Sequence, residues 1–214
     1  YKFAGLEASY RPLSTLSYFL IHSVAKLNPF YYHLTSLVLH TLNTLLVYWL
    51  AKIILRQHLQ ALIAGLLFAS HPVMTEAINC IDFNDDLLMT FFFLLALIVY
   101  IRTNAEKFLP NIGLCLLILL LYFLSLLSKE MAITFPAIIL LYDLMLRDVD
   151  RKVGDFRNQI NRLRTRIQFY AGMMLISLIY LTLRFGVLYN PGEALKGSAG
   201  NLAVRIIFLA GHLF

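Results

Sequence analysis

An acidic segment between two apolar runs holds residues whose types could do chemistry. Asp82, Asp85 and Asp86, with Glu76 a little earlier, bring four carboxylates into one short interval, which His71 opens. The chain around them is 60% hydrophobic. Carboxylates beside a membrane-spanning segment are costly and usually serve a function. Because a carboxylate can take the proton of an attacking hydroxyl, the segment predicts general-base or acceptor-positioning chemistry.

Two other interpretations of these carboxylates stay open. They can form a solvated loop that only links two apolar segments. If the segment is helical, Asp82, Asp85 and Asp86 share one face, and like charges at this spacing repel one another. Repulsion of this kind requires a cationic partner, so a divalent cation held by Asp82, Asp86 and His71 is a further hypothesis.

Basic residues elsewhere in the chain offer the complementary charge. Arg11 precedes Pro12, and Lys129 stands beside Glu130 after an apolar run. Such cations can hold a phosphate as negative charge develops on it, and the planar fork of arginine suits phosphate oxygens. The alternatives are an interfacial anchor for Arg11 and a helix start at Ser128, with Glu130 near the positive end of the dipole. This helix start explains Glu130 but not Lys129.

The composition is that of a helical membrane protein. Only 14% of the 214 residues are charged and the mean hydropathy is +0.74, whereas soluble domains carry about 25% charged residues. Polar residues stand in short intervals between long apolar runs. We therefore predict a single all-α, polytopic membrane domain over 1–214. Because the chain starts in a polar stretch and stops inside an apolar run, we expect it to be part of a longer protein.

Apolar runs and their breaks divide the chain into expected helices. Interfacial amphipathic helices are predicted at 12–27 and 148–166. About seven membrane-crossing segments are expected, at 30–55, 59–70, 87–101, 108–128, 131–146, 168–189 and 201–214. The basic 148–166 stretch is better explained by anionic lipid at the inner face than by nucleic acid, so we expect no nucleic-acid partner.

The distribution of charge predicts the orientation of these segments. Most of the 18 lysines and arginines lie in the intervals 52–56, 102–107 and 147–166, and the positive-inside rule places those intervals on the cytoplasmic face. Arg11, the acidic segment and the Lys129–Glu130 pair then share the outer face. We expect these three separated motifs to line one cavity beside the lipid.

Several other polar side chains are expected to be structural. His33 and His40 lie seven residues apart on one helical face, where packing or a polar contact between helices is favoured over ligation. Asp143 falls near the end of a span, where Arg147 could pair with it. The two cysteines occupy different environments and are not expected to form a disulfide.

Short motifs in a fixed order resemble those of a known family. They are Tyr10-Arg11-Pro12-Leu13, Tyr32-His33 with His40, HPVMTEA at 71–77 with Asp86-Leu87-Leu88, and Leu127-Ser128-Lys129-Glu130 followed by Ala132 and Tyr142-Asp143. Their order and spacing resemble the membrane half of the transmembrane and TPR repeat-containing O-mannosyltransferases and their bacterial relatives. These proteins belong to the GT-C class of glycosyltransferases.

The resemblance implies an integral-membrane glycosyltransferase that moves a sugar, such as mannose, from a polyprenyl-phosphate donor to an extracytoplasmic or lumenal acceptor. The four carboxylates of the acidic segment are then the catalytic candidates, Arg11 and Lys129 bind the donor phosphate, and His71 and Glu130 support them. The implied partners are the lipid-linked donor, membrane lipids, and a protein acceptor or a membrane complex. The expected location is the bacterial inner membrane or the endoplasmic reticulum.

The chain departs from the family pattern at two points. In the GT-C class a first acidic motif supplies the catalytic carboxylate, and this sequence begins after that point. In the acidic segment the family usually has Arg-x-Asp, whereas this chain has Asn84-Asp85-Asp86. A second function therefore stays open, that of a catalytically silent structural subunit of a membrane complex. A transporter or channel is disfavoured because its polar residues should lie near mid-membrane, and here most lie at span ends.

Overall fold

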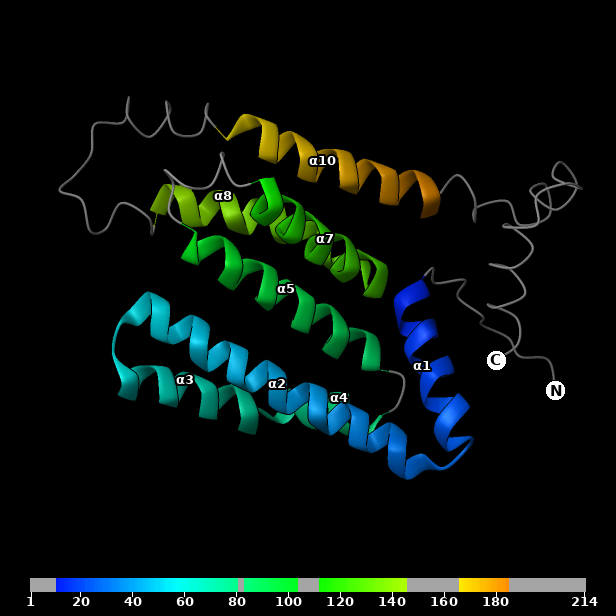
Figure 1. Cartoon of the computed structure of the whole chain (residues 1–214). Coiled ribbons are helices and arrows are strands. Elements are labelled where there is room, and N and C mark those ends of the chain that lie inside the picture. Colours follow the sequence, from blue (N-terminus) through cyan, green and yellow to red (C-terminus); the bar gives the residue numbers. More distant parts are fainter. Residues whose placement is uncertain (1–10, 81–82, 104–111, 146–165, 185–214) are drawn as a thin grey trace, which may run out of the picture.

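The computed structural model describes residues 11–80, 83–103, 112–145 and 166–184, and every element within these ranges is helical (Figure 1). The all-α prediction is confirmed. The elements are α1 (Pro12–Ala25), α2 (Pro29–Leu55), α3 (His58–Ser70), α4 (Pro72–Asn79), α5 (Asn84–Arg102), α7 (Ile112–Ser128), the 3-10 helix η2 (Glu130–Thr134), α8 (Phe135–Met145) and α10 (Ile167–Thr182).

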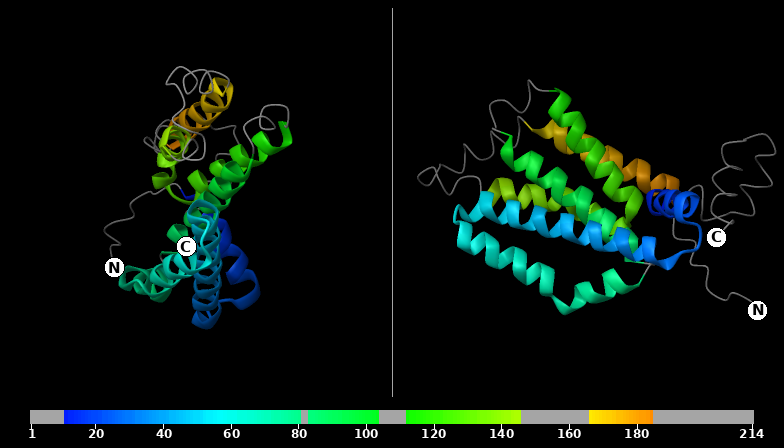
Figure 2. Two further views of the ribbon diagram at one scale, coloured as in Figure 1. Left: turned by 90° about the vertical axis from the view of Figure 1, so that its left-hand side faces the viewer. Right: turned by 60° about the horizontal axis from the view of Figure 1, so that its bottom comes forward.

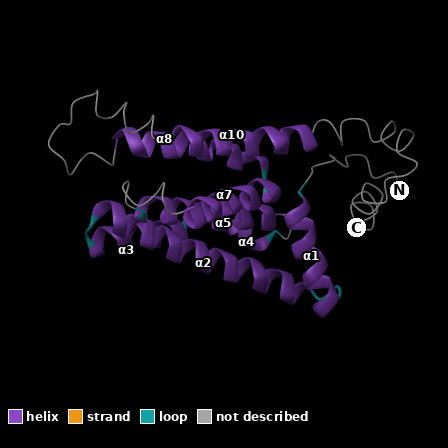
Figure 3. Ribbon diagram, turned by 45° about the horizontal axis from the view of Figure 1, so that its top comes forward, coloured by secondary structure: helices purple, strands orange, loops and turns teal. Residues whose placement is uncertain are grey.

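The long helices run side by side and form a bundle. α5 packs between α7 and α2, α3 packs along α2, and α10 packs against α7 (Figures 1 and 3). α1 differs from the others because it lies across one end of the bundle, where α2 and α5 begin and α7 ends (Figure 2). This placement brings the start of α1 close to helix termini that are distant in sequence.

The helices have the length and composition of an integral membrane protein. Within the described residues, α2 and α5 are long and apolar enough to cross a membrane, and the pair α3 and α4, bent by 48°, forms either a third, broken span or a re-entrant loop. α7 and α10 are shorter apolar helices. The seven or so spans expected from the sequence include 201–214, which lies outside the described residues, so that number stays a prediction. Large apolar side chains on α3 such as Leu59 and Leu67 are 69% and 64% exposed, as a lipid-facing surface requires.

Proline and the residue before it set several helix boundaries. Pro12, Pro29 and Pro72 each occupy the first turn of a helix, where a missing N–H costs nothing. The Asn28 side chain accepts the N–H of Phe30 at 3.1 Å and caps α2. α1 covers most of the helix expected at 12–27, whereas 148–166 lies outside the described residues except for its last position.

The acidic segment is more helical than the sequence suggested. Its first part forms α4, and α5 begins at Asn84 instead of at 87. Asp85 and Asp86 therefore occupy the first turn of α5, where the helix dipole favours negative charge. The solvated-loop interpretation is wrong for Asp85, which is 2% exposed. Asp82 lies outside the described residues.

A buried aromatic cluster joins α5, α7, α8 and α10. Tyr100, Tyr122, Phe135 and Tyr180 are almost completely buried. Tyr122 stacks on Phe135 with ring centroids 5.2 Å apart, and its hydroxyl lies 2.6 Å from Ser177 Oγ. Buried hydroxyls need such partners. The cluster thus fixes the relative positions of helices whose ends carry the polar residues.

Asp143 anchors a second polar cluster, at the end of the bundle away from α1. It pairs with Arg166 at 3.0 Å and accepts hydrogen bonds from Tyr100 at 2.5 Å and Tyr170 at 2.9 Å. The observed partner is thus Arg166; the expected partner, Arg147, lies outside the described residues. Because the cluster joins α5, α8 and α10, a structural role for Asp143 remains favoured.

His40 makes the kind of contact that was expected of it. Its Nε2 atom lies 3.3 Å from the carbonyl oxygen of Ala69, and its ring stacks against Phe68 at 5.6 Å. This is a polar contact between α2 and α3. Among the described residues, Cys80 and Cys115 do not form a disulfide.

Candidate functional site

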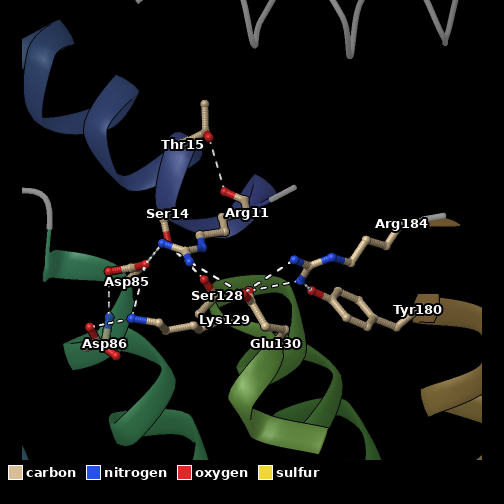
Figure 4. A network of polar contacts seen from close by, with 10 residues as sticks. All are labelled: Arg11, Ser14, Thr15, Asp85, Asp86, Ser128, Lys129, Glu130, Tyr180 and Arg184. Carbon is tan, nitrogen blue, oxygen red and sulfur yellow. Dashed lines mark hydrogen bonds and ion pairs between the residues drawn. The ribbon is translucent and has the colours of Figure 1, made fainter. Parts of the chain in front are cut away.

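Three segments that are far apart in sequence meet at the end of the bundle that α1 crosses. Arg11 comes directly before α1, Asp85 and Asp86 form the first turn of α5, and the Lys129–Glu130 pair links α7 to η2. Figure 4 shows their side chains pointing toward one another. The structure thus brings together five of the residues that the sequence singled out.

Asp85 is the buried centre of this network. Arg11 Nη1 donates a hydrogen bond to its Oδ2 atom, and Lys129 Nζ lies 3.8 Å from the same oxygen. Its Oδ1 atom accepts the backbone N–H of Asp86 at 2.9 Å. The side chain is only 3% exposed, and a carboxylate this deeply buried needs cations beside it. Asp85 therefore holds Arg11 and Lys129 in position.

Asp86 is the more open of the two aspartates. Lys129 Nζ lies 2.5 Å from Asp86 Oδ2, and the Asp86 side chain is 32% exposed. The ion pair joins the start of α5 to the end of α7, because the Lys129 N–H bonds the carbonyl of Ser125 at 3.1 Å. Both helix dipoles favour this arrangement, with the anion at an N-terminus and the cation at a C-terminus.

Arg11 is held by the backbone around it as well as by its charge partners. Its carbonyl accepts hydrogen bonds from the N–H of Thr15 at 3.0 Å and from the Thr15 hydroxyl at 3.1 Å. One turn on, Ser14 Oγ donates to the carbonyl of Ser128 at 3.3 Å and ties α1 to α7. These hydrogen bonds thus fix Arg11 in the site, and Arg11 also anchors the start of α1.

Arg184 is a member of the network that sequence reasoning missed. It follows α10, and its Nη1 and Nη2 atoms lie 3.0 Å and 3.4 Å from the two carboxylate oxygens of Glu130. It also donates a hydrogen bond to the hydroxyl of Tyr180 at 3.2 Å. The signal that could have found it is the charge distribution, which places Arg184 on the same face as Arg11.

Glu130 lies between two arginines and stays charged. Arg11 Nη2 lies 3.6 Å from Glu130 Oε1 on the side opposite to Arg184 (Figure 4). Partial burial alone would raise the pKa of this carboxyl group. Hydrogen bonds from Arg184 and a backbone N–H, with the charges of Arg184 and Arg11, outweigh burial and lower the pKa to about 2. Glu130 is therefore an anion at neutral pH and a poor general base.

The helix start expected at Ser128 is displaced. Ser128 is the last residue of α7 and its hydroxyl bonds the carbonyl of Leu124, while Lys129 stands at the cap position of η2 without a side-chain cap. Glu130 does open a helical turn, as that interpretation required. The alternative in which Ser128 is the N-cap is wrong because α7 extends through Ser128.

His71 and Glu76 stand apart from the ion pairs. His71 caps α4, since its Nδ1 atom accepts the N–H of Val73 at 3.3 Å, and Glu76 lies on α4 with its side chain exposed. In the described part of the chain, the ion pairs of the site include neither residue. Their expected supporting and catalytic roles stay predictions.

The chain lacks the arginine that the family usually has in the acidic segment, and residues from other segments supply positive charge in its place. Asn84 occupies that position, is 1% exposed, and has no hydrogen-bond partner for its amide among the described residues. Arg11 and Lys129 supply positive charge beside Asp85 from other segments. The charges of Asp85 and Asp86 are therefore balanced without an arginine at 84.

Within the described residues, no group of three or more His, Cys, Asp or Glu side chains is arranged to hold a metal ion. The repulsion between Asp85 and Asp86 is offset by Arg11 and Lys129. The hypothesised set of Asp82, Asp86 and His71 includes a residue outside the described part of the chain, so it stays a prediction.

The chain is similar to animal proteins named protein O-mannosyl-transferases. It is 38% identical over 152 residues to TMTC2 of Homo sapiens, 39% over 144 residues to TMTC1 of Mus musculus, and 33% over 141 residues to TMTC3 of Homo sapiens. These matches cover 67%, 64% and 64% of this chain. The chain spans 17%, 15% and 15% of the relatives' own lengths. No protein-family model matches the chain, and no solved structure matches it.

Proposed function

Because this chain is a homologue of the protein O-mannosyl-transferases over about two thirds of its length, we propose that it forms the membrane part of a mannosyltransferase. The proposed donor is a polyprenyl-phosphate sugar. The proposed acceptor is a protein hydroxyl on the extracytoplasmic or lumenal side. The names of the relatives support mannose and a protein acceptor, and the polar site supports a donor that carries phosphate.

The convergence of three motifs at one end of the bundle carries this proposal. Sugar transfer from a lipid phosphate needs cations that stabilise the charge developing on the leaving phosphate. It also needs a carboxylate that takes the acceptor's proton or positions its hydroxyl. Arg11 and Lys129 supply the cations, and Asp86 supplies a carboxylate that is open to solvent. All three lie at the end of an apolar bundle, where a lipid-linked substrate and a polar acceptor can meet.

The two aspartates take different parts in this proposal. Asp86 is the group that faces the acceptor, because its side chain is the more exposed. Asp85 is a positioning residue, since both of its oxygens are occupied by Arg11, Lys129 and a backbone N–H. Of these two aspartates, Asp86 is thus the proposed catalytic carboxylate, and Asp85 is not.

The site is proposed to face the lumen of the endoplasmic reticulum. Lys52, Arg56 and Arg102 lie at the opposite end of the bundle from Arg11 and Asp85 (Figure 1), and the positive-inside rule assigns that end to the cytoplasm. The relatives are animal proteins, which favours the endoplasmic reticulum over a bacterial inner membrane.

Transfer of mannose from a polyprenyl-phosphate donor, assayed with the full-length protein, tests the proposal. Asp86→Asn and Lys129→Ala should each abolish transfer while the protein remains inserted and folded. Lys52→Ala is the matched control, because it removes an exposed lysine at the far end of α2, and it should keep wild-type activity. Full activity in both site variants would contradict the site assignment.

A structural subunit without catalytic activity is the second candidate. It is favoured by the charge balance of the network, in which Arg11, Lys129 and Arg184 face three carboxylates. Such a balanced set can serve only to hold helices together. On this alternative the full-length protein transfers no sugar, and the same variants change its stability alone.

A further inference from the structure

Two arginines from opposite ends of the described chain form ion pairs with the Glu130 carboxylate, one on each side. Arg11 approaches from the start of α1 at 3.6 Å, and Arg184 approaches from beyond α10 at 3.0 Å and 3.4 Å. Arg184 presents two guanidinium nitrogens to the two oxygens of one carboxylate. Its orientation is fixed by the hydroxyl of Tyr180, whose side chain is fully buried.

This arrangement also matches what a phosphate group requires. Guanidinium groups bind carboxylate and phosphate oxygens with the same paired geometry, so a glutamate held by two arginines occupies a position that a phosphate can take. The site lies at an end of the bundle beside exposed apolar helix surfaces. A phosphate attached to a lipid chain could therefore reach it without leaving the membrane.

Glu130 is the carboxylate of the network that is easiest to displace. Its side chain is 35% exposed, against 3% for Asp85. Asp86 is similarly exposed but lies only 2.5 Å from its lysine. The formal charges of the three cations and three carboxylates cancel, so an entering phosphate must replace a carboxylate or leave an excess of negative charge. Releasing Glu130 into water costs least.

We propose that Arg11 and Arg184 form the seat of the donor's phosphate group, and that Glu130 occupies this seat until a polyprenyl phosphate displaces it. The inference rests on the proposed function and adds Arg184 to the residues that bind the donor. Lys129 keeps its ion pair with Asp86 during the exchange, so the carboxylate that faces the acceptor keeps its partner, and Lys129 adds its positive charge to the phosphate site from beside Arg11. Glu130 thereby keeps two arginines from repelling each other in the empty site.

The test is binding of a short-chain polyprenyl phosphate to the full-length protein in detergent. Arg184→Gln should weaken binding by about ten- to a hundredfold, since a charge-assisted hydrogen bond is lost. Arg184→Lys should fall between this variant and wild type, because it keeps the charge but loses the fork. Glu130→Gln should tighten binding by about two- to fivefold, because the competing anion is gone.

Four controls check the variants and the probe. Arg56→Gln makes the same chemical change at the far end of α2 and should leave binding unchanged. The corresponding polyprenol without phosphate should bind at least about tenfold more weakly than the phosphate. Inorganic phosphate alone should also bind more weakly, since it lacks the apolar chain. The melting temperature of each variant shows that it is folded.

Three outcomes would overturn the seat, and a fourth would overturn the proposed function. If Glu130→Gln weakens binding as Arg184→Gln does, Glu130 is an anchor for the site and not a competitor of the phosphate. If Arg184→Gln and Arg184→Lys both bind like wild type, Arg184 does not touch the donor. Equal affinity for inorganic and lipid phosphate would show that the seat accepts free phosphate and not the lipid donor. If wild-type protein binds no polyprenyl phosphate, the proposed function itself fails.

Discussion

Two neighbouring aspartates show how strongly position decides the role of a side chain. Asp85 and Asp86 are chemically identical and adjacent in α5, yet their side chains are 3% and 32% exposed. The buried one is surrounded by Arg11, Lys129 and a backbone N–H. The open one has Lys129 as its charge partner and a free path to solvent. Stability should therefore depend on Asp85 and transfer on Asp86.

The stability of the two asparagine variants tests this difference. Asp85→Asn leaves Arg11 without its buried anion and should lower the free energy of unfolding by about 3 kcal/mol or more. Asp86→Asn breaks a partly exposed pair and should cost about 1 kcal/mol or less. Denaturant unfolding in detergent measures both. Equal losses in the two variants would mean that burial does not distinguish them.

The acid dependence of stability should report on Glu130. Its pKa is lowered from the ordinary 4.5 to about 2 in the folded protein, so its ion pairs stabilise fully above pH 4.5. This stabilisation is lost as the pH falls from 4.5 toward 2. The difference in melting temperature between wild type and Glu130→Gln should be constant above about pH 5 and shrink below it. A difference that stays constant down to pH 3 would contradict the pairing.

At the scale of elements, breaks in the chain were easier to predict than the start of α5. Pro12, the Asn28-Pro29 pair and the His71-Pro72 pair end or begin helices where the sequence indicated, because proline acts through its own ring on its neighbours. The resemblance to the mannosyltransferase family also pointed to the relatives later found. These features depend on neighbouring residues or on the order of motifs along the chain, and the sequence shows both directly.

The start of α5 and the membership of Arg184 depend on residues far away. The sequence predicted a span from 87 and left the helicity of the acidic segment open, whereas Arg11 pairs with Asp85 across 74 positions and Arg184 contacts Glu130 across 54. The two residues of each pair are too far apart in the sequence for a local pattern to reveal their contact. That Arg11, the acidic segment and the Lys129–Glu130 pair share one end of the bundle could be predicted from charge counts, whereas the pairing at that end could not.

Packing between α2 and α3 depends on a glycine. A Cβ atom at Gly65 would lie 3.2 Å from Tyr48 Cβ, whereas one at Gly172 would lie 3.4 Å from a flexible methyl of Leu119. Gly172→Ala should therefore stabilise the protein by about 0.5 kcal/mol through helix propensity. Gly65→Ala should gain less or be destabilising, and Gly65→Leu should cost about 1–3 kcal/mol.

Thermal unfolding in detergent separates the two positions. The expected order of melting temperatures is Gly172→Ala, then wild type, then Gly65→Leu. If Gly65→Leu were as stable as wild type, α2 and α3 would not be in the close contact described here.

On the scale of the whole molecule, the two polar clusters mark the two ends of the bundle. Arg11, Asp85 and Glu130 lie at one end, and Asp143 and Arg166 at the other. The aromatic core and the apolar lengths of α5, α7 and α10 separate them. A bundle with this division has a defined direction in the membrane, and that direction can be measured.

Labelling of the exposed Cys80 should reveal this direction. Cys80 lies just before the acidic first turn of α5 and is exposed, while Cys115 lies within α7. In a Cys115→Ala background, a membrane-impermeant thiol reagent should modify Cys80 from the lumenal side. A cysteine introduced at Lys52 should react from the cytoplasmic side. Reaction of Cys80 from the cytoplasm would reverse the proposed orientation.

The order of the network's residues along the chain has a consequence for biosynthesis. Arg11 emerges from the ribosome 74 residues before Asp85, and Arg184 emerges after every other member of the network. Asp85 is therefore synthesised before Lys129, and the contacts of α1 with α5 and α7 can form only after all three helices have been made. The charged cluster is thus completed late in synthesis. In a nascent chain that ends before Arg184, Glu130 can pair with Arg11 alone.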